Sequence, residues 1–333
     1  MDYTTDNFLK TLYYGSEKLR SATDRMKLGE LLKEALGAFP PQDTPLQPVL
    51  LERRDHGSYV LERIAYTTME HVQVPVIVLV PKDGTQGPWP GILACHGHGN
   101  GQYDAVGRNA DDSEMNDPGI HNRFAVNLVH RGLVVAIPEI MGFGVRRMAE
   151  ELRTAPNYSS CGTLASQLLA YGKTLAGMRV YEAMRALDYL QFRDDVIGER
   201  IGAFGFSGGG LIAAYTAALD KRIKHTVLSG WANTFEGSIL AMHHCIDNYL
   251  PKLLLAAEQP DFIGLLSPRG LFVEAGEEDP IFPLEHTRKA ISTLENHYAV
   301  MGAEENFEFD VFPGGHRISG RKSFDWLAQR LAN

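Results

Sequence analysis

Residues 201–219 read IGAFGFSGGGLIAAYTAAL, and this stretch decides the fold. It carries no charge and is long enough to imitate a membrane span, but its central run of glycines and a serine argues against one. Residues 201–206 are typical of a buried strand and residues 208–219 of a helix. The segment GFSGG at 205–209 lies between them, where a sharp strand-to-helix turn needs small residues. The pattern predicts that Ser207 stands at the N-terminus of a helix with its hydroxyl exposed.

A serine hydroxyl is a weak nucleophile unless a base and an orienting acid lie beside it. His316 follows a predicted strand within the sequence PGGH, and we expect it to take the proton from Ser207. Asp279 follows the preceding predicted strand and is the expected acid, with Glu277 and Glu278 as alternatives. Two prolines shape the loop around Asp279, which favours Asp279 as a fixed partner of the histidine.

Stabilisation of a developing oxyanion requires two N–H donors near the nucleophile. Gly208 directly follows Ser207 and is the expected first donor. The sequence CHGHG at 95–99 follows a predicted strand, and the second donor is expected to be the N–H of His98 or of Gly97. His96 is expected mainly to support this loop, because an H-x-H pair beside a serine is only weak evidence for a metal site.

Five residues are candidates for the substrate pocket because they follow strand ends or lie in the segments that overhang them. Glu139 has an alternative role in pairing with Arg146 or Arg147, and Trp231 has one as a core aromatic. The pair His243-His244 with Cys245 is expected to pack or line the pocket rather than to bind metal. The pocket candidates are His96, Glu139, Trp231, His244 and Tyr103.

Strand and helix patterns alternate on both sides of residues 201–219, which predicts an α/β fold with a mostly parallel central sheet and helices on both faces. An antiparallel pair at 59–67 and 71–80 precedes it, and residues 7–39 show helical spacing. We expect an N-terminal helical arm at 1–50 and a catalytic domain at 51–333, with a short cap-like insertion at 232–266. Expected strands are 91–95, 133–138, 201–206, 225–229, 270–275 and 307–312, and expected helices are 122–131, 163–193, 208–219, 284–300 and 323–331.

The composition of the 333-residue chain restricts its partners. A net charge of −9 disfavours nucleic acid and anionic membranes, so the expected partner is a small molecule. Three widely spaced cysteines indicate free thiols, and no secretory signal is visible, so a cytoplasmic location is expected. No dinucleotide fingerprint is present, and neither an organic cofactor nor a metal is expected.

The chain resembles the dienelactone hydrolase-like and acetyl xylan esterase-like branch of the α/β-hydrolase superfamily. The resemblance covers residues 55–333 and rests on HGHG at 96–99, GFSGG at 205–209, GEEDPIFP at 276–283 and PGGH at 313–316; HHCIDNYLP at 243–251 adds to it. It implies the α/β-hydrolase fold and hydrolysis of carboxylic esters through an acyl-enzyme. Dienelactone hydrolases themselves use a cysteine nucleophile, whereas this chain has Ser207, which favours an ester over a lactone.

These observations predict a serine carboxylic ester hydrolase that acts on a small ester, such as an acetyl ester of a sugar or small alcohol. The same triad would serve a thioesterase or a lactonase. From another class, a non-catalytic ligand-binding scaffold of this fold is the alternative, but it would need a broken triad. The N-terminal arm is expected either to cap the site or to join subunits in a homo-oligomer.

Overall fold

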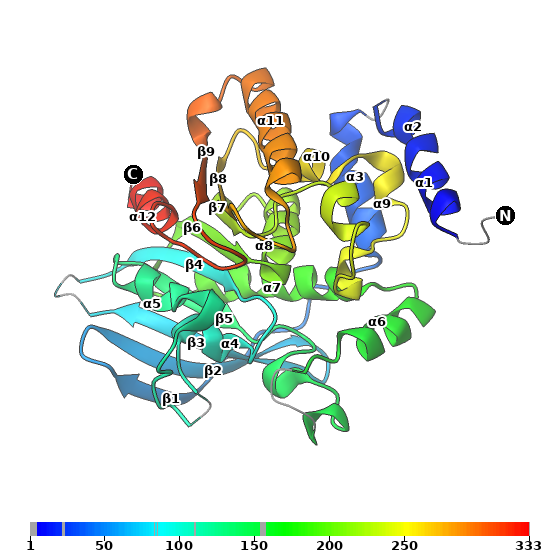
Figure 1. Cartoon of the computed structure of the whole chain (residues 1–333). Coiled ribbons are helices and arrows are strands. Elements are labelled where there is room, and N and C mark those ends of the chain that lie inside the picture. The colour runs from blue at the N-terminus through cyan, green and yellow to red at the C-terminus, as the bar shows by residue number, and fades with distance from the viewer. Residues whose placement is uncertain are drawn as a thin grey trace.

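The central sheet of the computed structural model has nine strands, and the structure describes residues 5–21, 24–82, 84, 86–109, 111–153 and 158–332. In spatial order the strands are β1 (Val49–Asp55), β2 (Tyr59–Met69), β3 (Val72–Pro81), β5 (Val134–Pro138), β4 (Trp89–Cys95), β6 (Val196–Phe206), β7 (Ile223–Ser229), β8 (Gly270–Gly276) and β9 (Phe307–Phe312) (Figure 1).

Six of these strands are parallel and three are antiparallel. Strands β4 to β9 run parallel to one another, while β1, β2 and β3 form an antiparallel edge that joins them through the antiparallel pair of β3 and β5. The predicted α/β class and mostly parallel sheet are therefore confirmed. Strand β1 was not predicted, because six of its seven residues are exposed and its sequence lacks an apolar alternation.

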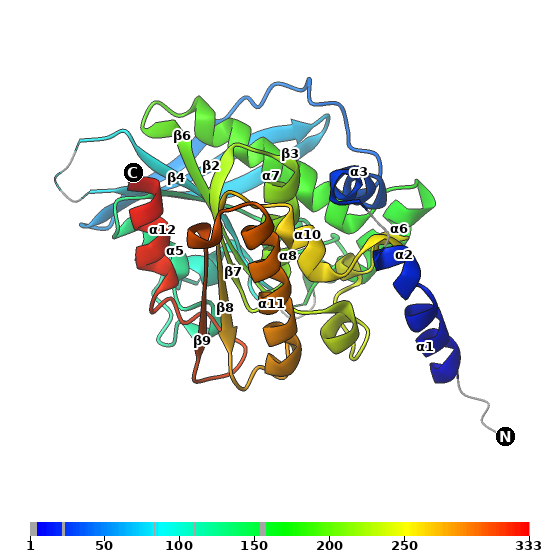
Figure 2. The same ribbon diagram turned by 90° about the horizontal axis from the view of Figure 1, so that it is seen from above.

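Helices cover both faces of the sheet (Figure 2). One face packs against α3 (Arg25–Leu36), α7 (Leu175–Phe192), α8 (Gly208–Leu219), α10 (Gln259–Gly264) and α11 (Leu284–Val300). The other face packs against α4 (Gln102–Val106), α5 (Phe124–Val129) and α12 (Ser323–Ala332). Two separate hydrophobic clusters result, as expected for a sheet whose strands are apolar on both sides.

The helix expected over residues 163–193 is divided in the structure. It consists of α6 (Cys161–Ala170) and α7, with a break at Gly172, whose φ of +67° is left-handed. Thr174 then caps α7, because its hydroxyl accepts a hydrogen bond from the Gly177 N–H at 2.9 Å. A continuous helix was the wrong prediction here, since helical periodicity alone does not reveal a short break of this kind.

The N-terminal arm comprises α1 (Asp6–Gly15), α2 (Glu17–Ser21) and α3. Helix α1 has no buried residue, whereas α3 buries Leu28, Leu32 and Leu36 in the main core. The first helix touches residues 232–266 through the Tyr13 hydroxyl, which donates to Glu258 Oε1 at 2.7 Å. Helix α3 of the arm therefore packs in the core, whereas helix α1 contacts the segment 232–266 from outside.

Residues 232–266 form a run of short helices instead of a compact lobe. They are η4 (Phe235–Ile239), η5 (Ile246–Asn248), α9 (Leu253–Ala256) and α10. Other short helices are η1 (Gly119–His121), η2 (Gly144–Arg146), η3 (Glu151–Arg153) and η6 (Glu304–Asn306). Among the described residues, no helix combines the length and the apolar character that a membrane span requires.

Candidate active site

Ser207 occupies the turn between β6 and α8 in a strained backbone conformation. Its φ of +53° and ψ of −124° are unfavourable for a residue with a side chain. The Ser207 N–H donates to the Ser229 carbonyl at 2.9 Å, which ties the turn to β7. A Cβ on Gly205 would lie 2.4 Å from the Gly209 carbonyl oxygen, and one on Gly209 would lie 2.1 Å from the Cys95 carbonyl oxygen. Glycine is therefore required at both positions for this turn to close.

The structure brings Ser207, His316 and Asp279 together in one hydrogen-bonded chain. His316 Nε2 lies 2.9 Å from Ser207 Oγ, and His316 Nδ1 lies 2.7 Å from Asp279 Oδ2. The serine follows β6, the acid follows β8 and the histidine follows β9, all at the carboxyl ends of parallel strands. This arrangement has the geometry by which a histidine activates a serine hydroxyl while a carboxylate holds the ring.

Asp279 differs from its acidic neighbours in its surroundings. Its side chain is 1% exposed, and its second oxygen, Oδ1, accepts the N–H groups of Ile281 at 2.8 Å and Phe282 at 3.0 Å. Glu277 and Glu278 are exposed. The carboxylate that faces His316 is thus fixed in position by two backbone donors.

Two aromatic rings hold the His316 imidazole. The Phe206 ring stacks on it with a centroid distance of 5.0 Å, and the Phe282 ring does so at 5.6 Å. Gly230 lies against the same imidazole, since a Cβ there would be 3.2 Å from His316 Cε1. These contacts restrict rotation of the histidine and keep Nε2 directed toward Ser207.

The two candidates for the second oxyanion donor have different surroundings. The Gly97 N–H already donates to His121 Nε2 at 3.1 Å. The His98 ring lies over Gly208, because a Cβ on that glycine would be 3.3 Å from two ring atoms. In the described part of the chain, no hydrogen bond occupies the backbone N–H of either His98 or Gly208.

His121 was not predicted as a site residue, yet its side chain binds the backbone of the loop that carries His98. Its side chain is 3% exposed, and burial lowers the pKa of His121 to about 4. The ring is therefore neutral near pH 7, so Nε2 is free to accept from Gly97. Nothing in the sequence around residue 121 signals this role, which depends on the approach of η1 to the end of β4.

A cavity of ≈ 250 Å³ opens beside the Ser207 hydroxyl. Burial lowers the pKa of His244 in its wall, so that this ring is neutral near pH 7. The described residues that line the cavity are His98, Ile120, Phe206, Ser207, Gly208, Trp231, His243, His244, Cys245, Asn248, Ile281, Phe282 and His316.

Of the five pocket candidates, the structure places two in the cavity wall. The Trp231 indole donates to Asn248 Oδ1 at 3.3 Å, and His244 Nε2 lies 2.9 Å from the hydroxyl of Ser238. Tyr103 lies outside the lining, and its hydroxyl accepts from Arg63 at 3.1 Å.

His96 and Glu139 are fully buried and lie outside the described lining of the cavity. The Ile140 N–H donates to His96 Nε2 at 3.2 Å, which ties the ends of β4 and β5 together. Glu139 Oε1 accepts the Gln102 N–H at 3.1 Å, and the Arg146 guanidinium donates to the backbone carbonyl of Glu139 at 3.1 Å while its ion pair is with Glu182. Both side chains therefore lie where they support the loops around the site.

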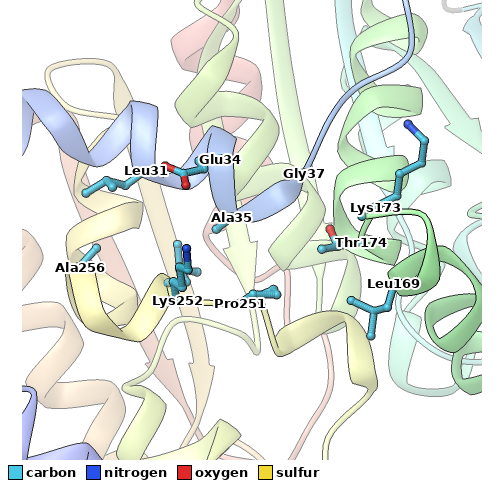
Figure 3. A pocket seen from close by; sticks show the side chains of 12 residues that line it. Leu31, Glu34, Ala35, Gly37, Leu169, Lys173, Thr174, Pro251, Lys252 and Ala256 are labelled. Atoms are coloured by element: carbon cyan, nitrogen blue, oxygen red, sulfur yellow. The ribbon is translucent and has the colours of Figure 1, made fainter.

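A second cavity of ≈ 380 Å³ lies between α3, the α6–α7 junction and residues 251–256 (Figure 3). Leu31, Ala35 and Leu169 give it an apolar wall, and the Lys173 ammonium donates to the Ala38 carbonyl at 2.9 Å. Among the residues that the structure describes, its lining includes no cysteine, histidine or serine side chain. The cavity beside Ser207 is therefore the better candidate for an active site.

Comparison with known proteins gave consistent matches. A family model described as "Abhydrolase family" matches residues 24–309. The Bacillus subtilis (strain 168) protein named "Putative hydrolase YtaP" is 30% identical over 284 residues, which cover 83% of this chain and 89% of that protein.

Solved structures with a similar fold cover most of the chain. A "putative acetyl xylan esterase" from Bacteroides fragilis superposes with a TM-score of 0.76 at 18% identity, covering 94% of this chain and 83% of that one. A glucuronoyl esterase from Solibacter usitatus does so with a TM-score of 0.69 at 15% identity, covering 94% and 93%. At these identities the similarity is one of fold.

Proposed function

Since this chain belongs to the abhydrolase family, we propose that it is a serine carboxylic ester hydrolase with Ser207 as nucleophile. The observation that supports this most directly is the continuous chain from Ser207 Oγ through His316 to Asp279, with separations of 2.9 and 2.7 Å. The esterase names of the structural neighbours agree with this proposal.

The proposed reaction follows from the geometry. Ser207 Oγ attacks the ester carbonyl while His316 Nε2 takes its proton, and the N–H groups of Gly208 and His98 stabilise the oxyanion. His316 then protonates the departing alcohol, which leaves an acyl group on Ser207. A water molecule, deprotonated by the same histidine, hydrolyses this acyl-enzyme.

We further propose that the substrate is a small ester, such as an acetyl ester of a sugar or small alcohol. The cavity of ≈ 250 Å³ lies below the range of about 300–1,000 Å³ that is common for drug-sized ligands. Polar groups from His243, His244 and Asn248 line it, and these are suited to an alcohol that carries hydroxyl groups.

A panel of aryl esters with acyl chains of increasing length tests this proposal. We expect the highest kcat/KM for acetate and a decline as the chain outgrows the cavity. The Ser207→Ala variant should lose at least about 1,000-fold in kcat and all labelling by a fluorophosphonate. The exposed Ser166 provides the matched control, because Ser166→Ala should leave both unchanged.

Other outcomes separate the alternatives. Turnover or labelling retained by Ser207→Ala would refute Ser207 as nucleophile. Reaction with short thioesters or lactones but not with esters would favour a thioesterase or a lactonase on the same triad. An absence of labelling in the wild-type protein would favour a non-catalytic ligand-binding scaffold.

A further inference from the structure

Three side chains from distant parts of the sequence meet beside the candidate active site, two of them in the wall of its cavity. One ligand atom each from His98, Cys161 and Cys245 lies within 4.8 Å of the other two. His98 belongs to the loop after β4, Cys161 begins α6, and Cys245 directly precedes η5. All three cysteines of the chain are free thiols, and the third, Cys95, is buried elsewhere at the end of β4.

The donor set is that of a soft or borderline metal ion. Two thiolates and one imidazole are a known ligand set for Zn²⁺, at about 2.3 Å for sulfur and about 2.0–2.1 Å for nitrogen. In a tetrahedral site, these bond lengths place ligand atoms about 3.5–3.8 Å apart. The observed upper limit of 4.8 Å means that shifts of about an ångström would bring the three atoms into coordination.

The surroundings of the cluster are polar and organised. Arg179 Nη2 donates to Cys161 Sγ at 3.2 Å, and the same side chain donates to the Met141 carbonyl at 2.6 Å. N–H donors to ligand atoms of this kind orient the ligands of metal sites. The buried carboxylate of Asp247 pairs with Arg179, so the guanidinium does not leave a net positive charge beside the sulfur atoms.

We propose that His98, Cys161 and Cys245 bind one Zn²⁺ ion, with a fourth coordination position filled by water. His98 and Cys245 line the cavity beside Ser207, while Cys161 is buried behind them. The ion thus reaches its ligands through the cavity. This proposal departs from the expectation of no metal, because the three ligands are far apart in the sequence and only the fold brings them together.

The ion would join the loop after β4 to α6 and to residues 232–266. In the proposed site the imidazole of His98 binds the metal, and its backbone N–H, which makes no hydrogen bond within the described part of the chain, stays available to the oxyanion. Zn²⁺ would therefore help to position the loop that carries a proposed oxyanion donor. This consequence rests on the proposed esterase function, whereas metal binding itself does not.

Metal loading of the full-length protein tests the proposal. The tag-free protein is treated with chelator in the presence of a non-coordinating reductant and then titrated with Co²⁺. We expect one equivalent to bind, with the thiolate-to-cobalt absorption in the near ultraviolet and the visible bands of tetrahedral cobalt, and one equivalent of Zn²⁺ to displace it. Three ligand variants, Cys161→Ser, Cys245→Ser and His98→Ala, should each weaken cobalt binding. The expected loss exceeds the factor of about 10–100 that is typical when a group hydrogen-bonded to a metal ligand is removed.

Matched controls make the result specific. Cys95→Ala should keep the stoichiometry and the spectrum, because Cys95 lies outside the cluster. Ser207→Ala should bind the metal as the wild type does, so loss of esterase activity and loss of metal binding are scored separately. Substoichiometric binding, or binding unaffected by the three ligand variants, would overturn the proposal. So would a Cys161–Cys245 disulfide found by mass spectrometry in protein that was never chelated.

Discussion

Asp279 shows how one carboxylate among three is selected. It is preceded by Glu277 and Glu278, and the sequence could only favour it through the prolines nearby. In the structure, Asp279 alone of the three is buried, and it lies 2.7 Å from His316 Nδ1 while two backbone N–H groups hold its other oxygen. The selection is made by burial and orientation, both of which belong to the folded loop.

Replacement of this carboxylate gives a clear test. We expect Asp279→Asn to lower kcat by about 10⁴-fold with little change in KM, because an amide favours the wrong histidine tautomer. Steady-state kinetics on a short aryl ester provide the measurement, and Glu277→Gln is the matched control. Equal losses in the two variants, or a loss confined to KM, would contradict the assignment.

The turn between β6 and α8 is the element on which the site depends. It holds Ser207 in a strained conformation because α8 packs closely against the end of β4. Gly209 lies at this contact, where a methyl group would meet the carbonyl oxygens of Cys95 and His96 at 2.1 and 2.5 Å. Backbone atoms in a buried sheet move little, so a side chain at residue 209 would leave a steric clash that small shifts do not remove.

Gly209→Ala should therefore destabilise the protein by about 1–3 kcal/mol or more. Gly208→Ala is the matched control, since its methyl group would meet only the His98 ring at 3.3 Å and alanine is the better helix former. Urea unfolding followed by circular dichroism measures both. Equal midpoints for the two variants would show that the close approach of α8 and β4 does not limit the turn.

Two histidines, the buried His121 and the half-buried His225, make the stability of the whole molecule depend on pH. Burial lowers the pKa of both His121 and His225 to about 4. In the unfolded chain these residues titrate near the ordinary value of about 6.5, so between pH 6.5 and 4 the unfolded state binds more protons. Their stabilising contribution is complete above pH 6.5 and is lost as the pH falls toward 4.

The free energy of unfolding should consequently fall between pH 7 and pH 4.5, with up to about 3 kcal/mol from His121 by pH 4. His121→Gln should reduce this slope, because its amide oxygen accepts from Gly97 without titrating. His71→Gln is the control at a side chain that is 90% exposed. An unchanged slope in His121→Gln would contradict the prediction; if that variant does not fold, an NMR titration showing His121 protonated near pH 6.5 would do so.

Much of the fold and of the site arrangement was predictable from local patterns. The parallel strands, the turn at Ser207 and the loops that carry Asp279 and His316 all leave short-range signals in the sequence. The break in the helix at Gly172 and the exposed strand β1 leave no such signal. The break does not interrupt the apolar periodicity of the helix, and β1 has no apolar alternation. The roles of the triad residues and of the cap-like segment at 232–266 stay predictions.

The sequence alone determined where Ser207, the proposed nucleophile, stands, because backbone sterics within five residues allow GFSGG to form only a narrow range of turns. Only the tertiary structure decided which carboxylate meets His316, that His121 occupies the Gly97 N–H, and that His98, Cys161 and Cys245 converge. These contacts join residues from separate segments of the chain. Their distances are set by how helices and loops pack on the sheet, and no local spacing in the sequence encodes that packing.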